Sequence, residues 1–249
     1  RVEPGAFRLE RILPAPGPAL IVNLYENETR VYADDAERRC ARTAGTAFSG
    51  QSTRSFLIDT REQIAVMGVV FRPGGGACFL REPMERLCDR HTALADLAGP
   101  AADALRERLL NTPDAAARLA VLEAWLRARF VVDALHPALA RALAALERAP
   151  CVERAGGLIA ASGYSARHFG TLFRSQVGVG PKRFARLRRF RAALAHVRHG
   201  EAVDWARVAA DCGFHDQPHL VREFREFAGT TPARYVAARG DGVNYVPLT

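Results

Sequence analysis

The sequence contains no Cys-x-x-Cys pair and no apolar run long enough to cross a membrane. Its cysteines are odd in number and ten or more positions apart: Cys40, Cys78, Cys88, Cys151 and Cys212. Such a set argues against a disulfide framework and a thiolate zinc site, and it favours reduced thiols in a cytosol. The best apolar run, Ile64–Phe71, has the length of a strand, well short of the roughly 18–20 residues of a membrane helix. Because no signal-peptide core is present either, we expect a cytoplasmic protein with no membrane partner.

Residue patterns typical of catalysis are also scarce. Histidine is absent before His91, so the first part of the chain offers no imidazole ligands to a catalytic metal. Gly74, Gly75 and Gly76 follow an apolar run, but no Gly-Lys-Ser/Thr comes after them, which favours a tight turn over a phosphate-binding loop. No group of nucleophile, base and orienting residue can be picked out. The sequence therefore predicts no cofactor, no metal and no enzyme, and catalysis on the N-terminal region stays as a less favoured alternative.

Positive charge is distributed unevenly along the 249 residues. Residues 1–150 hold 20 basic and 19 acidic side chains, whereas residues 151–249 hold 15 basic and 8 acidic ones. Nearly all of the net charge of +8 therefore belongs to the last two-fifths of the chain. A cationic region joined to a neutral one indicates that the C-terminal part meets a polyanion. A general solubilising excess of charge is the alternative interpretation.

The first 71 residues contain the short apolar or alternating runs that are typical of β-strands. Their short polar connections, with no intervening helix, predict an antiparallel sandwich or barrel. Residues 35–52 are small and polar, and they predict a long loop. The expected strands are Phe7–Leu13, Ala19–Tyr25, Thr29–Ala33, Arg54–Asp59 and Ile64–Phe71.

From Glu82 onward, apolar residues recur with the period of a helix. Three helices are expected here, at Ala101–Leu110, Ala115–Val131 and Pro137–Arg148. We interpret them as a coat for the sheet, and a dimerisation surface is the alternative. Ala149-Pro150 marks a boundary close to the position where the charge balance changes.

Residues 163–184 and 213–235 repeat each other. The first copy reads Gly-Tyr-Ser, then Phe-x-x-x-Phe-Arg, then Gly, Pro and Phe. The second copy reads Gly-Phe-His, then Leu-x-x-x-Phe-Arg, then Gly, Pro and Tyr. Landmarks that match at an offset of 50 or 51 residues exceed coincidence, so the chain holds two copies of one structural unit.

Each copy has the layout of a helix-turn-helix. A helix (Val152–Ser162 or Val203–Cys212) ends at a glycine able to adopt the left-handed conformation, and a capping residue, Ser165 or Asp216, starts the second helix. A linker helix over Lys182–His199 joins the copies. We interpret the basic residues of this linker, which fall mostly off its buried stripe, as a platform that faces phosphates. The platform residues are Lys182, Arg183, Arg186, Arg188, Arg189 and Arg191. A plain helical bundle that arose by duplication is the alternative.

Three features follow one another in order: Gly-Tyr-Ser-x-x-x-Phe-x-x-x-Phe-Arg, the linker helix, and Gly-Phe-x-x-Gln-x-x-Leu-x-x-x-Phe-Arg followed by Gly-Thr-Thr-Pro-x-x-Tyr. Together they resemble the DNA-binding domain of the AraC/XylS transcription regulators, over about residues 150–238. The N-terminal part, from residues 69–75 to residues 93–97, is similar to a sensor-like domain found in one AraC subgroup. The family implies a small-molecule pocket in that part. Its candidate lining residues, each also explained as simple core, are Phe7, Leu24, Phe56, Met67 and Phe71.

The resemblance implies that the second helix of each unit enters a major groove of double-stranded DNA. Two units in one chain would reach successive major grooves about 34 Å apart, so the DNA site would be asymmetric. Gln217 would pair with adenine and Arg222 with guanine, whereas Arg174 and Arg225 suit phosphates or ion pairs within the domain. The predicted DNA contacts are Arg167, Thr171, Arg174, Lys182, Arg183, Gln217, His219, Val221, Arg222 and Arg225.

We therefore predict an α+β chain in three parts. Residues 1–149 form an antiparallel β-rich, barrel- or sandwich-like sensor or dimerisation domain that ends in helices. Residues 150–240 form an all-α domain of two helix-turn-helix units joined by a linker helix, and residues 241–249 form a tail. The predicted function is a bacterial, sequence-specific DNA-binding regulator of transcription that is modulated by a small-molecule effector. An architectural DNA-binding protein without an effector is the alternative, and RNA polymerase and a second copy of the chain stay open as partners.

Overall fold

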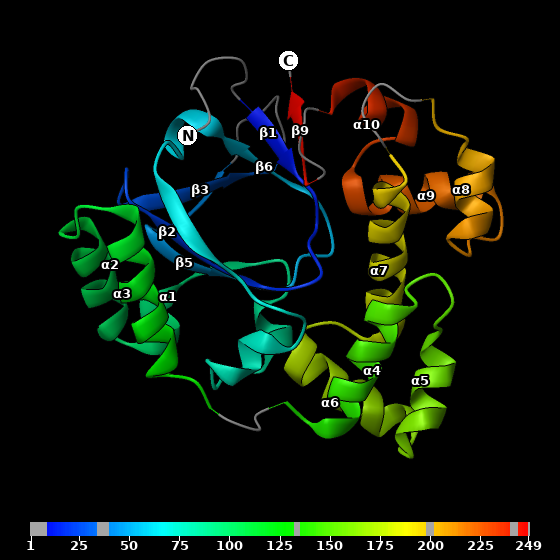
Figure 1. Ribbon diagram of the computed structural model, residues 1–249, viewed down its shortest axis with the longest axis horizontal. Coiled ribbons are helices and arrows are strands. Elements are labelled where there is room, and N and C mark those ends of the chain that lie inside the picture. Colours follow the sequence, from blue (N-terminus) through cyan, green and yellow to red (C-terminus); the bar gives the residue numbers. More distant parts are fainter. Residues whose placement is uncertain (1–8, 34–39, 132–134, 198–201, 240–243, 249) are drawn as a thin grey trace.

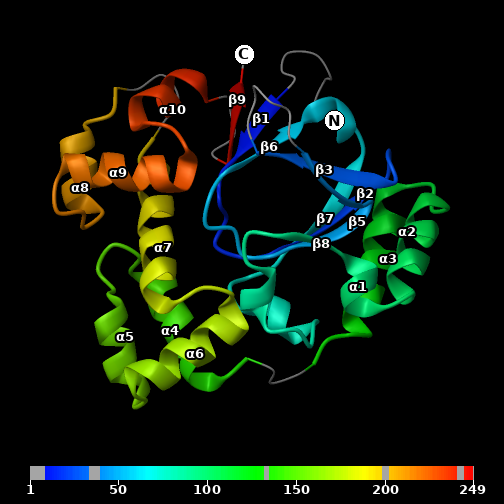
Figure 2. The ribbon, with the colours of Figure 1, turned by 180° about the vertical axis from the view of Figure 1, so that it is seen from behind.

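A half built from β-sheets lies beside a half built from helices (Figures 1 and 2). The computed structural model describes residues 9–33, 40–131, 135–197, 202–239 and 244–248. Antiparallel sheets come first and the helical region follows, which confirms the predicted α+β class. No helix in these ranges is both long and apolar enough to pass through a bilayer.

The larger sheet has five antiparallel strands in the order β4-β3-β6-β1-β9. They are β1 (Leu9–Ile12), β3 (Glu28–Tyr32), β4 (Cys40–Ala44), β6 (Phe56–Asp59) and β9 (Tyr245–Leu248). The edge strand β9 comes from the end of the chain and lies beside β1, near the start (Figure 1). The ladder places Arg11 opposite Val246 and Glu10 opposite Pro247, and the backbone N–H of Leu13 donates to the carbonyl of Asn244 at 2.9 Å. The C-terminal segment therefore completes the N-terminal sheet.

The second sheet has four antiparallel strands in the order β7-β2-β5-β8. They are β2 (Ala19–Asn23), β5 (Thr46–Ser49), β7 (Val66–Val70) and β8 (His91–Ala93). Two expectations were wrong here. Strands β4 and β5 lie inside the segment predicted as a long loop, and β8 lies after Glu82, in the region where only a helical period was expected. All four residues of β5 are buried, and β2 and β8, both remote in sequence, pair with its two edges.

Short helices connect and cover the second sheet. The elements are η1 (Thr60–Glu62), η2 (Gly75–Cys78), η3 (Met84–Leu87), α1 (Leu94–Ala98), α2 (Ala101–Leu110) and α3 (Ala115–Arg127). Leu105 of α2 and Trp125 of α3 share a buried cluster with Leu20 and Phe48 of the sheet. The Trp125 indole also donates to the carbonyl of Ala101 at 3.1 Å. These helices form the predicted coat.

The remaining helices build the second half of the molecule. They are α4 (Pro137–Arg148), α5 (Ala155–Ser162), α6 (Ala166–Val177), α7 (Pro181–Ala195), α8 (Trp205–Asp211), α9 (Gln217–Ala228) and α10 (Pro232–Ala238). Helix α4 was expected to coat the sheet, and this was wrong. Its Leu139 and Leu146 are fully buried in one cluster with Phe169 and Phe173 of α6, because its apolar stripe packs on the first repeat unit.

The core around α9 also contains side chains from the sheet half. Phe190, Phe224 and other helical residues form a buried cluster that includes Leu13, which follows β1, and Val246 of β9. Leu13 is 2% exposed and Val246 is 3% exposed. The two halves of the molecule therefore share one apolar core.

Replacing Leu13 by alanine should destabilise the helical half although Leu13 lies outside it in sequence. We expect the Leu13→Ala change to lower the free energy of unfolding by about 2–5 kcal/mol, the range for a buried leucine. Leu119→Ala is the control, because Leu119 is 59% exposed on α3 and should change stability by less than about 0.5 kcal/mol. Urea unfolding followed by helical circular dichroism measures both, and equal midpoints would contradict the shared core.

Candidate nucleic-acid interface

The first repeat unit consists of α5 and α6. Helix α5 ends at Gly163, whose φ of 74° is left-handed, as the sequence predicts. The hydroxyl of Ser165 then caps α6 by accepting a hydrogen bond from the backbone N–H of His168 at 3.2 Å. Phe169 and Phe173 of α6 are fully buried. Arg167 and Thr171, away from these two phenylalanines on the same helix, are exposed and accessible to a ligand.

The second unit repeats this geometry in α8 and α9. Gly213 has a φ of 67°, and the carboxylate of Asp216 accepts from the backbone N–H of His219 at 2.6 Å. This hydrogen bond, together with one from His215, lowers the pKa of Asp216. Leu220 and Phe224 are fully buried. The predicted turns and caps of both units are confirmed.

Most of the predicted DNA contacts lie on the outer faces of the two units. Arg183, His219 and Val221 are half-buried. Among the described residues, Arg167, Lys182, Arg222 and Arg225 have no side-chain hydrogen bond or ion pair. The exposed members of the predicted set are Arg167, Thr171, Arg174, Lys182, Gln217, Arg222 and Arg225. Contact of any of these residues with DNA stays a prediction.

Four of the predicted contacts are held by partners within the chain: Thr171, Arg174, Arg183, which binds Glu226 and Thr53, and His219. The Nε of Arg174 lies 3.4 Å from Oε2 of Glu85 in η3, and its Nη2 donates to Oγ1 of Thr171 at 3.2 Å. The Nδ1 of His219 accepts from the backbone N–H of His215 at 3.2 Å. Helix α6 is therefore tied to the sheet half through Arg174.

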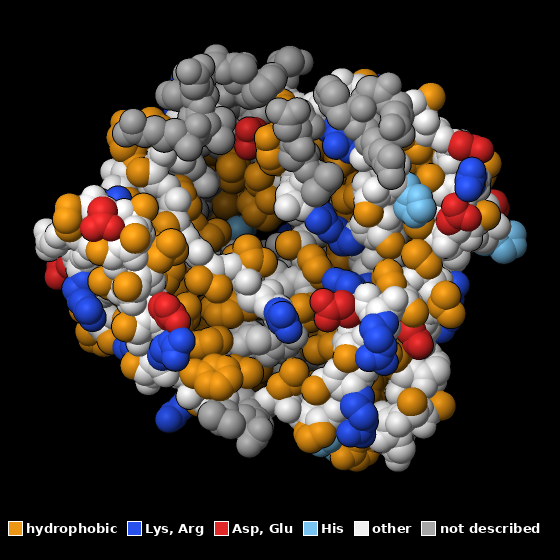
Figure 3. Space-filling view, in the orientation of Figure 1, with side chains coloured by type: hydrophobic (Ala, Val, Ile, Leu, Met, Phe, Trp, Pro, Cys, Tyr) orange, Lys and Arg blue, Asp and Glu red, His pale blue; other side chains and the backbone are white. Residues whose placement is uncertain are grey.

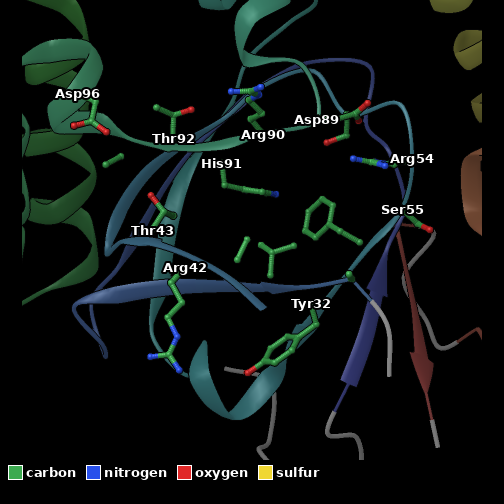
Figure 4. A pocket seen from close by; sticks show the side chains of 16 residues that line it. Tyr32, Arg42, Thr43, Arg54, Ser55, Asp89, Arg90, His91, Thr92 and Asp96 are labelled. Atoms are coloured by element: carbon green, nitrogen blue, oxygen red, sulfur yellow. The ribbon is translucent and has the colours of Figure 1, made fainter. Parts of the chain in front are cut away.

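A cavity of about 710 Å³ lies between the two sheets. Its walls come from β3, β4, β6 and β8, from Ser52, Arg54 and Ser55, and from Asp89, Arg90 and Asp96, and Figure 4 shows the side chains that line it. Figure 3 shows a hollow over the sheet half of the molecule. Of the candidate pocket residues, Phe56 lines the cavity, whereas Leu24, Met67 and Phe71 pack in the core under α2 and α3. Phe7 lies outside the described residues.

The cavity combines charged and aromatic side chains. Arg54 and Arg90 and the carboxylates of Asp89 and Asp96 belong to its lining. His91 lies edge-on to the Phe56 ring, with 4.8 Å between the ring centroids, and Figure 4 shows its ring between the cavity walls. Burial lowers the pKa of His91 to about 4, so the ring is neutral near pH 7. Its Nδ1 is buried without a hydrogen-bond partner in the described part of the chain. No sequence pattern marked His91, Asp89 or Arg54.

Comparison with known proteins identifies the helical half. Residues 158–238 match the family described as Helix-turn-helix domain. The chain carries an AraC-type helix-turn-helix domain. Residues 3–93 match a domain of unknown function (DUF6597), and no curated protein matches the chain. The AraC-type domain together with the fold supports a DNA-binding regulator of transcription.

Solved structures of ToxT from Vibrio cholerae are similar over nearly the whole chain. The 1.65 Å structure of ToxT has a TM-score of 0.52 at 10% identity, and the match covers 94% of this chain and 95% of that one. ToxT with a bound unsaturated fatty acid has a TM-score of 0.46 at 11% identity, covering 92% of this chain and 91% of that one. At 10% identity, the first of these likenesses shows the fold alone.

The linker helix of the AraC-type domain, α7, does not present its arginines as a phosphate platform. Arg186 binds the buried carboxylate of Glu223, with Nη2 to Oε1 at 2.8 Å, and also Glu226. Arg189 is 8% exposed and donates to the carbonyl of Gly213 at 3.3 Å. Arg191 donates to the side chain of Asn244. The platform interpretation was wrong for these three, because their guanidinium groups are engaged by carboxylates, a carbonyl and a side-chain amide of the protein itself.

Protonation of His91 should destabilise the protein as the pH falls. Its pKa of about 4 in the folded state lies below the ordinary value of 6.5, so the unfolded chain binds the proton first. Stability is therefore full above about pH 6.5 and falls between about pH 6.5 and pH 4. The His91→Gln variant lacks this titration. Between pH 7 and pH 5, its free energy of unfolding should therefore fall by about 2 kcal/mol less than that of the wild type. Urea unfolding at both pH values measures the difference, and parallel losses would show that His91 is not buried as described.

Proposed function

We propose that this chain is a sequence-specific transcription regulator that reads DNA with α6 and α9 and responds to a small molecule bound between its two sheets. The observation that supports DNA reading is the duplicated unit, whose second helices carry exposed arginines that form no side-chain hydrogen bond or ion pair with the described residues. Arg167 lies on α6, and Arg222 and Arg225 lie on α9. Arginine and glutamine on a helix are the usual readers of guanine and adenine in the major groove.

The arrangement of the helices suits two successive grooves. Fifteen residues give α7 a length of roughly 22 Å, and α7 lies between α6, which precedes it, and α9, which packs along it at Arg186 and Phe190 (Figures 1 and 2). A single chain then supplies both reading helices, so the DNA site is asymmetric and neither a second copy nor RNA polymerase is needed for binding. Where the helix spacing differs from about 34 Å, the duplex bends to meet both.

The second unit is the stronger reader in this proposal. Arg174 of the first unit is engaged with Glu85, which leaves Arg167 as its free cation, among the described residues of α6. The second unit offers Gln217 and Arg222 for bases, with Arg225 for a phosphate. Lys182, at the start of α7, is exposed and suits a phosphate as well.

Arg222→Ala should remove base discrimination at one position of the DNA site. We expect a loss of about 1–3 kcal/mol in specific binding and a relaxed preference at that base pair, because one bidentate contact to guanine disappears. The wild-type chain is first used to select a duplex from a random library. Fluorescence anisotropy then measures the affinity of each protein for versions of this duplex that carry all four base pairs at each position. Arg108→Ala is the control, since Arg108 is exposed on α2 in the sheet half. Unchanged preferences in Arg222→Ala would exclude this residue as a reader.

The cavity favours a ligand-responsive regulator over an architectural DNA-binding protein. Its volume of about 710 Å³ falls in the range of small-molecule sites, about 300–1,000 Å³. The side chains of Arg54, Asp89 and His91, all in its lining, offer polar contacts inside it. An architectural protein has no use for such a cavity, because its binding depends on the DNA alone.

Filling the cavity should abolish the response to an effector and leave DNA binding intact. Ala41 lines the cavity and is exposed on β4, so Ala41→Trp adds bulk there without opening a core. A metabolite library is first screened for molecules that change the affinity of the wild type for the selected duplex at least fivefold. The same screen is then repeated on this variant. We expect the variant to bind the duplex with an affinity within about twofold of that of the wild type and to lose the response to the effector. The added side chain changes contacts only in the cavity, which is separate from the DNA-reading helices. A response retained in full would place the effector elsewhere.

A further inference from the structure

One short segment, residues 51–55, separates the cavity from the DNA-binding half. Its side chains alternate between two environments. Ser52 and Arg54 line the cavity, whereas Gln51 and Thr53 are buried, at 2% and 4% exposed. Ser55 borders the cavity as well. The 51–55 segment therefore forms part of the cavity wall and is one strand of backbone thick.

The other side of the 51–55 segment contacts three helices of the AraC-type domain. A Cβ atom on Gly178, which ends α6, would stand 3.2 Å from the Cβ of Gln51. Arg183, in the first turn of α7, donates from Nη2 to the carbonyl and the hydroxyl of Thr53, at 3.3 and 3.0 Å. The backbone N–H of Ser55 donates to the carbonyl of Phe227, near the end of α9, at 2.9 Å. The segment thus touches the ends of both second helices and the start of the helix between them.

A polar chain runs through this segment from the cavity to α9. Asp89 lines the cavity. Its Oδ1 accepts from the backbone N–H of Thr53 and its Oδ2 from the Thr53 hydroxyl, both at 2.6 Å. Arg183 binds the same hydroxyl at 3.0 Å, and its Nη1 lies 2.8 Å from Oε1 of Glu226 on α9. Four side chains therefore connect the cavity wall with the second reading helix.

The backbone conformation of Asp89 makes the cavity end of this hydrogen-bonded relay sensitive to a bound molecule. Its φ is 54°, and among the described residues it is the only one other than glycine with a positive φ. Aspartate tolerates this conformation better than most residues, at a cost that its surroundings must offset. The two hydrogen bonds to Thr53, and one from the backbone N–H of Asp89 to the carbonyl of Gln51 at 3.1 Å, hold it. A molecule that competes for the Asp89 carboxylate, or moves Arg54, therefore changes the segment that seats α7 and α9.

We propose that the 51–55 segment, with Asp89 and Arg183, couples the cavity to the second reading helix α9. The proposal rests on the proposed function and specifies how its two sites communicate. Occupation of the cavity shifts Thr53, Thr53 shifts Arg183, and Arg183 with the Ser55–Phe227 hydrogen bond resets the position of α9. Such coupling is reciprocal by thermodynamic necessity, so DNA bound at α9 must alter the free energy of binding in the cavity, and the relay passes this change through the Asp89 wall. Reciprocity allows a test before any effector is identified.

The test measures amide hydrogen exchange of the full chain, residue by residue, with and without the duplex selected from a random library. The amides of Thr53 and Ser55 report the two ends of the coupling, because they donate to Asp89 and Phe227. The amide of Asp89 reports the cavity wall. We expect the duplex to change exchange at all three amides by about fivefold or more, the lower end of usual coupling strengths.

Thr53→Val removes the hydroxyl at nearly constant shape and should interrupt the relay. In this variant we expect the duplex to change exchange at Asp89 by less than twofold, while exchange of the α9 amides still responds as in the wild type. Thr43→Val is the matched control, since Thr43 also lines the cavity but lies on β4, away from the segment. It should respond as the wild type does. Asp89→Asn, which keeps a residue suited to positive φ, serves as a second interruption if Thr53→Val fails to fold.

The outcomes separate the two proposals. If the wild-type chain selects no duplex, the proposed function is overturned. If it binds a duplex but exchange at Thr53, Ser55 and Asp89 does not change, the coupling is overturned and DNA reading stands. A change at Asp89 that persists in both Thr53→Val and Asp89→Asn would also overturn the relay, because the signal would then travel by another path.

Discussion

The arrangement of the whole molecule depends on one apolar core that belongs to both halves. Leu13 comes from the sheet half and Val246 from the last strand, and both are buried among the aromatic side chains of α7, α9 and α10. Removing either half would expose these groups to water, so the core keeps the sheets and the second helix-turn-helix unit in a fixed relation. The polar contacts between the halves are weaker and directional. They work because the core brings their partners within hydrogen-bond distance.

The repeat could be predicted because every signal for it is local. Gly163 and Gly213 end their helices in left-handed conformations, and Ser165 and Asp216 cap the helices that follow. Each of these features acts over about four residues, so it is legible in a short window of sequence. The buried aromatic residues of α6 and α9 follow from the same helical period. The two helix-turn-helix units of the helical half could therefore be predicted from the sequence.

The parts that could not be predicted depend on partners far away in the chain. Strand β5 is short and looks like a loop until β2 and β8 pair with it. Arg186 looks like a phosphate ligand until Glu223, 37 positions later, accepts its hydrogen bonds. The cavity is assembled from separated segments around Phe56 and His91, and no single segment shows it. The positive charge along the linker helix α7 thus led us to expect phosphate contacts, whereas several of its arginines bind partners within the protein.

Pro247 has a consequence for the solubility of the larger sheet, whose outermost strand on one side is β9. Leu13 and Asn244 are a hydrogen-bonded pair, and pairs alternate along an antiparallel ladder, so the position of Pro247 opposite Glu10 is a non-hydrogen-bonded one. The backbone nitrogen there points away from β1, to the outer edge of the sheet, where Pro247 is buried. Proline has no N–H to offer at that point. The last strand therefore closes the sheet against edge-to-edge aggregation while it joins the two halves of the protein.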